Sequence, residues 1–133
     1  MKSKPTVGTV CQKQFMVEPA HAIDFARDGM PAVLCTPWLI WFLEHTAREA
    51  VLPCLEAVES TVGTEIEISH LAPTPVGQTV ICLARVIGVD GFRVSFQLEA
   101  RDQHELIAKG FHKLQIIRVD RFAARVERKS SRS

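Results

Sequence analysis

One apolar stretch, residues 35–52, constrains the fold of this chain more than any other. It reads CTPWLIWFLEHTAREAVL and would carry bulky apolar side chains around most of a helix. Thr36 followed by Pro37 predicts the start of that helix, with Thr36 as N-cap and proline at the first helical position. We expect the helix to run from Pro37 to about Cys54. Glu44 and its charged neighbours argue against a membrane span, so the pattern favours a buried helix wrapped by a sheet.

The rest of the chain predicts strands. Residues 6–17 mix β-branched and polar residues and predict a first strand that Pro19 ends. After the helix, segments of alternating polarity are separated by turn sequences, among them the hairpin signal Asp90-Gly91. In the first of these segments, strict alternation puts Val62, Thr64 and His70 on the core side and Gly63 on the other. The four predicted strands are residues 60–70, 79–89, 92–101 and 106–119.

This order of elements predicts an α+β architecture. A five-stranded antiparallel sheet wrapped around one long central helix is the arrangement called a hotdog fold. A length of 133 residues fits a single domain, and we expect its basic end, from about residue 127, to be a flexible tail. Open sheet edges predict a homodimer formed by edge pairing, with a dimer of dimers as the larger alternative.

The overall charge of the chain is nearly balanced, and only its C-terminal region is distinctly basic. The chain has 16 basic and 15 acidic residues, which gives no general reason to expect a nucleic-acid or membrane partner. Only Phe122 lies among the basic residues at the end, so stacking on nucleic-acid bases is not expected. This end is either a solvated surface or an attraction for an anionic ligand. Its basic residues are Arg118, Arg121, Arg125, Arg128, Lys129 and Arg132.

Cysteine usage points to a reducing compartment. The four cysteines show neither a CxxC pair nor zinc-ligand spacing, and three of them lie in apolar runs, as expected of reduced thiols in a cytoplasmic protein. The first residues do not form a signal peptide pattern. No glycine-rich phosphate loop, dinucleotide fingerprint or Cys/His set with zinc-finger spacing occurs, and we expect no metal and no redox cofactor.

Three residues are candidates for chemistry. A carboxylate at Glu44, among aromatic neighbours, is expensive to desolvate unless it is paired or lines a cavity; the alternative is a helix-surface pair with Arg48. His70 is a catalytic candidate or a hydrogen-bonded core histidine, and Thr36 a reactive hydroxyl or a plain N-cap. Thr36 and Glu44 are about 12 Å apart along one helix. Either Thr36 therefore lies on a loop that folds back, or Glu44 of one subunit works beside Thr36 of the other.

The phrases LCTPWLIWFLEHTAREA, TVGTEIEISHLAPTPVGQTV and AKGFHKLQIIRVDRFAARV resemble hotdog thioesterases of the fluoroacetyl-CoA thioesterase type. The resemblance covers residues 15–126 and implies hydrolysis of an acyl-CoA thioester at a dimer-associated site, with no cofactor besides the substrate's coenzyme A. It implies that Thr36, Glu44 and His70 are the catalytic threonine, glutamate and histidine. Gly63 would line the acyl pocket, with Phe42 and Met30 as further substrate contacts, and His112 matches a histidine position of the last strand.

Several functional alternatives remain open at this stage. The nucleophile is either Thr36, activated by His70, or the carboxylate of Glu44, which could instead position water. The segment before Thr36 is shorter than in the fluoroacetyl-specific enzyme and lacks its pair of lid phenylalanines, which favours a small or medium acyl group over fluoroacetyl. The competing functions are a non-catalytic acyl-CoA-binding hotdog protein and a hotdog enoyl-CoA hydratase or dehydratase.

Overall fold

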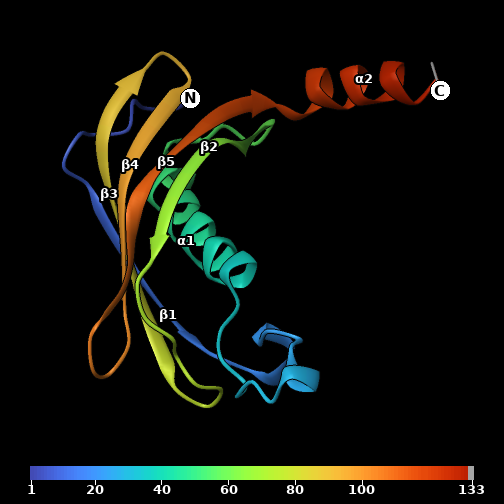
Figure 1. Cartoon of the computed structure of the whole chain (residues 1–133). Coiled ribbons are helices and arrows are strands. Elements are labelled where there is room, and N and C mark those ends of the chain that lie inside the picture. The colour runs from blue at the N-terminus through green and yellow to red at the C-terminus, as the bar shows by residue number, and fades with distance from the viewer. Residues whose placement is uncertain (132–133) are drawn as a thin grey trace.

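A computed structural model describes residues 1–131. Its five strands form one antiparallel sheet in the order β1-β3-β4-β5-β2, and α1 packs against the concave face of that sheet (Figure 1). The predicted α+β hotdog architecture is therefore confirmed. The elements are β1 (Val10–Met16), α1 (Thr36–Val51), β2 (Glu59–His70), β3 (Thr79–Asp90), β4 (Arg93–Arg101), β5 (Leu106–Arg118) and α2 (Val119–Ser130), with short 3-10 helices at Pro19–His21, Ala26–Asp28 and Leu52–Cys54.

The core lies between α1 and the sheet. Leu39, Leu43 and Ala47 of α1 are completely buried, as the apolar pattern of the stretch requires. Each large aliphatic side chain buried in this way contributes about 1.5–3 kcal/mol relative to an exposed one. The sheet contributes every second residue of two adjacent inner strands to this core, namely Val80, Cys82, Ala84 and Val86 of β3 and Val94, Phe96, Leu98 and Ala100 of β4.

The start of α1 differs from the prediction in one respect. Thr36 is not the N-cap: Cys35 occupies that position in an extended conformation, and Thr36 is the first helical residue. The N-cap provides no side-chain hydrogen bond to the first turn of the helix. At the other end, α1 stops at Val51 and a 3-10 turn continues to Cys54, where the apolar pattern also ends.

A register shift in β2 overturns part of the predicted alternation. The pairing with β5 slips between Gly63 and Glu65, so Thr64 is an extra residue. Before it, Gly63 pairs with Leu114, which is buried, so Gly63 lies on the core side and Val62 does not. After the shift, the even-numbered residues lie on the core side, and His70 opposite buried Ala108 is as predicted. A single extra residue exchanges the faces, because strand side chains alternate with a period of two.

The two ends of the chain also differ from expectation. The first strand begins at Val10, not Thr6, because a turn around Gly8, with φ of +96°, precedes it. The last strand ends at Arg118, and α2 follows it. The predicted tail from residue 127 is part of this helix as far as Ser130. Residues 132–133 of that tail lie outside the described part of the chain. None of the helices within residues 1–131 has the length and hydrophobicity that crossing a bilayer would need.

Candidate active site

Thr36 and His70 meet at the point where α1 begins and β2 ends. Thr36 Oγ1 and His70 Nδ1 lie 2.8 Å apart, so the two residues share a hydrogen bond. With the ring proton on Nε2, the hydroxyl of Thr36 donates to Nδ1. Both side chains line an open cavity of about 320 Å³, whose other walls are Ile23, Val33, Leu34, Leu71, Ala72 and Pro73. A polar pair thus faces a mostly apolar cavity.

The environment of His70 favours its neutral form. Burial lowers the pKa of His70 below 6.5, and a backbone group of Ala72 partly opposes this shift. Nε2 of His70 is buried and has no hydrogen-bond partner among residues 1–131. At neutral pH, the ring therefore presents an unprotonated nitrogen to the hydroxyl of Thr36, which is what a general base requires.

The first turn of α1 adds a favourable field. Thr36 is the first residue of the helix, where backbone N–H groups lack helical partners and the helix dipole is positive. The side chain of the N-cap, Cys35, makes no hydrogen bond to this end, and Pro37 has no N–H, so the donors among the first three helical residues are the N–H groups of Thr36 and Trp38. A negative charge that develops beside Thr36 would be stabilised there.

Glu44 lies in a second cavity on the core side of β2. This cavity, of about 230 Å³, is lined by Glu44, His45, Arg48, Thr61, Gly63, His112 and Leu114. A Cβ placed on Gly63 would lie 3.1 Å from Glu44 Oε2 and 3.3 Å from His112 Cε1, so the carboxylate and the ring both lie directly over the glycine. Glycine leaves the floor of this cavity open where any side chain would fill it.

His112 is the buried neighbour of Glu44. It is 3% exposed, and its Nδ1 lies 2.9 Å from the carbonyl oxygen of Glu65, which fixes the ring. The ring of Phe96 stacks on it with the centroids 6.1 Å apart. A histidine held in this way positions its remaining ring edge beside the carboxylate and Gly63. The resemblance pointed to His112 in the sequence, but nothing in the sequence indicated that this histidine lies beside Glu44.

Within one chain the three predicted residues do not form one site. Thr36 belongs to the helix itself, so the alternative of a loop that folds back is wrong. Thr36 and Glu44 line different cavities and are separated by about 12 Å of helix. The structure therefore brings Thr36 together with His70, and Glu44 together with Gly63.

The two remaining substrate-contact candidates lie elsewhere. Phe42 is 1% exposed and its ring stacks on Phe15 at 4.4 Å, so it belongs to the core and lines neither cavity. Met30 is 47% exposed on the segment before α1 and lines neither cavity. The lining residues that sequence reasoning missed include Thr61 and Ile23. Thr61 would have been found only if the register shift in β2 had been anticipated.

Comparisons with known proteins identify the family of this chain. Residues 17–120 match the family model described as fluoroacetyl-CoA-specific thioesterase. The fluoroacetyl-CoA thioesterase of Streptantibioticus cattleyicolor is 31% identical, with 98% of each chain covered. A crystal structure of a point mutant of the fluoroacetyl-CoA-specific thioesterase FlK superposes with a TM-score of 0.88 at 30% identity, over 96% of this chain and 99% of that one.

A further solved structure extends the likeness beyond that enzyme. A Thermus thermophilus protein described as a thioesterase superfamily member superposes with a TM-score of 0.88 at 28% identity, over 96% of this chain and 95% of that one. The family match covers both the helix that carries Thr36 and Glu44 and the strand that carries His70. On this evidence the chain belongs to the family of fluoroacetyl-CoA-specific thioesterases.

Proposed function

We propose that this protein is an acyl-CoA thioesterase that hydrolyses a small or medium acyl-CoA thioester to the free acid and coenzyme A. The hydrogen bond between Thr36 and His70, at the open N-terminus of α1, is the observation that carries the proposal. It combines a hydroxyl, a neutral base and backbone N–H donors at one cavity. The family supports the same chemistry, since its named members act on fluoroacetyl-CoA.

A homodimer would complete the site. β2 is an edge strand, and its residues from Gly63 to Glu67 are exposed. When two such edges pair antiparallel about a two-fold axis, the end of one β2 lies beside the start of the other. That pairing brings His70 of the partner subunit beside Thr61 and Gly63, at the cavity that holds Glu44. Two sites per dimer would then each combine Thr36 and His70 of one subunit with Glu44 of the other.

The proposed reaction uses these groups in two steps. First, Thr36 Oγ attacks the thioester carbonyl and its proton passes to Nδ1 of His70; the C–S bond breaks and the departing thiolate takes that proton from His70. Then water attacks the acyl-threonine ester, Glu44 accepts the proton from this water, and the acid leaves as Thr36 regains a proton from Glu44. The free N–H groups of α1 would hold the oxyanion in both steps.

Covalent trapping separates this route from direct attack by Glu44. In the proposed route, Glu44→Gln slows the second step, so an acyl group accumulates on Thr36 and adds its mass to the intact protein. Thr36→Ala should then show neither the adduct nor turnover. If Thr36→Ala kept turnover within a few fold of wild type while Glu44→Gln lost it, the carboxylate would be the nucleophile and the two-step route would be wrong.

The acyl group is proposed to be small or medium, without selectivity for fluorine. The segment before α1 contributes Ile23 and Val33 to the cavity, while Phe25 and Met30 are exposed and do not line it. Rates of free-thiol release from acetyl-, butyryl-, hexanoyl-, phenylacetyl- and fluoroacetyl-CoA rank the substrates. Cleavage of fluoroacetyl-CoA far faster than acetyl-CoA would contradict the proposed selectivity, and binding of every ester without thiol release would indicate an acyl-CoA-binding protein.

The cellular setting is proposed on similar grounds. We propose that the protein works in the cytoplasm, because its cysteines, Cys11, Cys35, Cys54 and Cys82, are free thiols as that reducing compartment favours. The reaction as written needs only water and groups of the chain, so we propose that no cofactor takes part.

A further inference from the structure

The C-terminal helix α2 carries an apolar stripe that nothing in its own chain covers. Val119, Phe122 and Val126 are 48%, 42% and 47% exposed, and no residue of the helix is buried. Their spacing of three and four residues puts them on one face. The helix projects from the end of β5 away from the body of the molecule (Figure 1). Helices of about 12 residues are marginal in water unless an apolar face packs against something.

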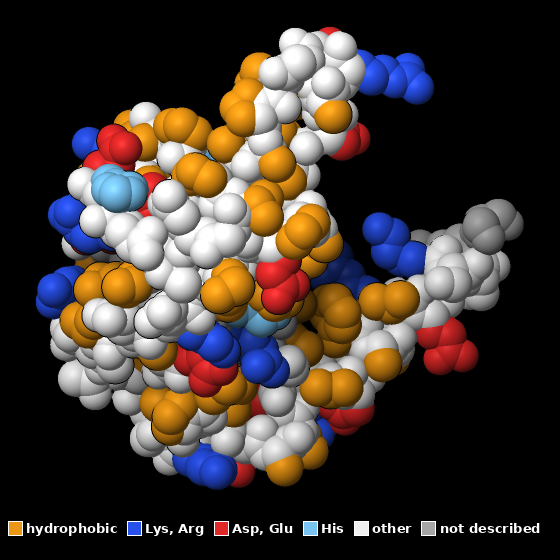
Figure 2. Space-filling view, turned by 90° about the horizontal axis from the view of Figure 1, so that it is seen from below, with side chains coloured by type: hydrophobic (Ala, Val, Ile, Leu, Met, Phe, Trp, Pro, Cys, Tyr) orange, Lys and Arg blue, Asp and Glu red, His pale blue; other side chains and the backbone are white. Residues whose placement is uncertain are grey.

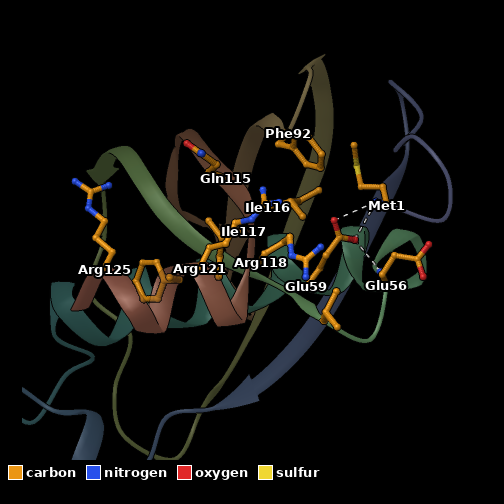
Figure 3. Close-up of a pocket in the computed structure, with 12 residues that line it drawn as sticks. Met1, Glu56, Glu59, Phe92, Gln115, Ile116, Ile117, Arg118, Arg121 and Arg125 are labelled. Carbon is orange, nitrogen blue, oxygen red and sulfur yellow. Dashed lines mark hydrogen bonds and ion pairs between the residues drawn. The ribbon is translucent and has the colours of Figure 1, made fainter. Parts of the chain in front are cut away.

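The stripe continues into an open cavity at the base of α2. This cavity, of about 570 Å³, lies between α2, the start of β2 and the end of β5, and Phe122, Phe92 and Ile117 are among its apolar walls (Figure 3). Of its two acidic residues, Glu56 and Glu59, the second is neutralised by an ion pair with the amine of Met1 at 3.0 Å. Viewed from below, hydrophobic side chains follow the arm that carries α2 along the hollow beside the body (Figure 2).

We propose that α2 packs on a second copy of this chain, with its apolar stripe over the entrance of the partner's cavity that holds Thr36 and His70. The proposal rests on the dimer of the proposed function. Antiparallel pairing of two β2 edges puts the end of the partner's β2 beside the start of this one. α2 begins at that start, where the N–H of Val119 donates to the carbonyl of Val58 at 2.9 Å. The helix is thus continuous with the proposed interface.

The surface of the partner that α2 would cover also carries exposed apolar side chains. Leu71 follows directly after His70 and is 50% exposed, and Phe25 and Met30 on the segment before α1 are 52% and 47% exposed. That segment is held near the end of β2, because the N–H of Leu34 donates to the carbonyl of Thr74 at 2.8 Å. Two exposed apolar surfaces would cover one another in the dimer.

Charge distribution agrees with this pairing. The polar face of α2 is basic, with Arg121, Arg125, Arg128 and Lys129 against Asp120 and Glu127. Arg121 and Arg125 make no ion pair within the described residues. The segment that α2 would meet is acidic, with Glu18, Asp24 and Asp28 against Arg27. Opposite charges at the rim of an interface favour the correct partner and orientation.

An anionic membrane is the other surface that the chemistry of α2 fits, and the test below includes it as an outcome. A basic amphipathic helix can lie on an anionic membrane surface. The second copy is favoured because α2 begins beside the open β2 edge, and because the acidic residues Glu18, Asp24 and Asp28 suit the basic face of the helix. A helix that covers the partner's cavity also gives the entrance a wall that one chain lacks, so loss of α2 contacts should impair catalysis as well as association.

Sedimentation velocity on three full-length variants tests the proposal. Phe122→Ser combined with Val126→Ser removes two of the three side chains of the stripe, Ala124→Ser places a serine on the opposite face, and Phe25→Ser alters the surface that α2 would meet. We expect a wild-type dimer, a dimer dissociation constant at least tenfold higher for the double variant and for Phe25→Ser, and no change for Ala124→Ser.

Three outcomes would overturn the proposal. They are a wild-type monomer at every concentration, a double variant or Phe25→Ser that dimerises as tightly as wild type, and wild-type binding to phosphatidylserine vesicles that the double variant loses. Thiol release is measured in parallel on the same samples. Absence of release from any ester by wild type would refute the proposed function alone, since the association constants would still decide where α2 packs.

Discussion

Thr36 Oγ1 and His70 Nδ1 lie 2.8 Å apart although 34 residues separate them in the chain. The first residue of α1 and the last residue of β2 are brought together because the sheet curves around the helix and places its edge strand beside the helix N-terminus. The hydroxyl of Thr36 bonds to the histidine and does not cap α1. This leaves the helix N–H groups open, which is an arrangement useful for chemistry and costly for the stability of an ordinary helix start.

Substitution of Thr36 should separate its hydroxyl from its role in the helix. Thr36→Ser keeps an Oγ that can reach His70, whereas Thr36→Ala removes it. We expect Thr36→Ser to retain turnover within about tenfold of wild type and Thr36→Ala to lose at least about 10²-fold, the range for loss of an activated nucleophile or its base. Thiol release with acetyl-CoA measures both. Equal activity in the two variants would show that the hydroxyl takes no part.

The pH dependence should report the depressed pKa of His70. Because burial lowers this pKa below 6.5, the ring gives up its proton at lower pH than a free histidine and stays neutral, and therefore basic, further into the acid range. The acid limb of kcat/KM should consequently have its midpoint below 6.5, with activity lost as pH falls through it. NMR titration of the His70 ring in the free enzyme should give the same midpoint, and a midpoint above 6.5 in both would contradict the buried environment.

Gly63 should tolerate no side chain without loss of catalysis. A Cβ there would lie 3.1 Å from Glu44 Oε2, so Gly63→Ala must displace the carboxylate. Misplacement of a catalytic group by about 1 Å can cost about 10²-fold, and we expect kcat to fall by at least about tenfold with little change in stability. Gly88→Ala is the matched control, because its Cβ would meet the nearest atom at an ordinary 3.8 Å. Equal kcat for both variants would place Glu44 outside the mechanism.

Gly110 should be required for folding and not for chemistry. A Cβ on this residue would overlap the carbonyl oxygen of Glu67 on the neighbouring strand, so Gly110→Ala must push β2 away from β5. We expect a loss of about 1–3 kcal/mol in the free energy of unfolding, typical of overpacking in a tight contact. Urea denaturation compares it with Gly88→Ala. Stability equal to that of the control would mean that the edge strand shifts without cost.

Thiol reactivity should distinguish one cysteine from the other three. Burial raises the pKa of the Cys82 thiol to about 12, partly opposed by the hydroxyl of Thr46, and the side chain is completely buried in β3. Cys11, Cys35 and Cys54 are partly exposed. Labelling of the native protein at pH 8 should therefore be slower for Cys82 by at least about 10²-fold. Cys82→Ala should remove the slow phase only; its persistence would assign that phase to another thiol.

Much of the architecture could be read from local pattern. The apolar run from Pro37 to Val51 has no stable exposed form, so a covering sheet follows from burial alone. Alternation and turn residues located β3, β4 and β5 to within about one residue at most ends. Local signals failed where a choice depended on a distant residue. One such choice was the N-cap, because His70 bonds to the hydroxyl of Thr36.

The same distinction between local sequence signals and distant contacts applies to the candidate site. Residue type and spacing alone determined that Thr36, Glu44 and His70 were the groups to consider, since an ionisable group in an apolar run is costly without a role. Only the tertiary structure decided that Thr36 and His70 touch, that Glu44 lies over Gly63 beside His112, and that these are separate cavities in one chain. The physical reason is the extra residue at Thr64, which reverses the faces of β2, together with the curvature that brings the strand's end to the helix. Neither has a signal in local sequence.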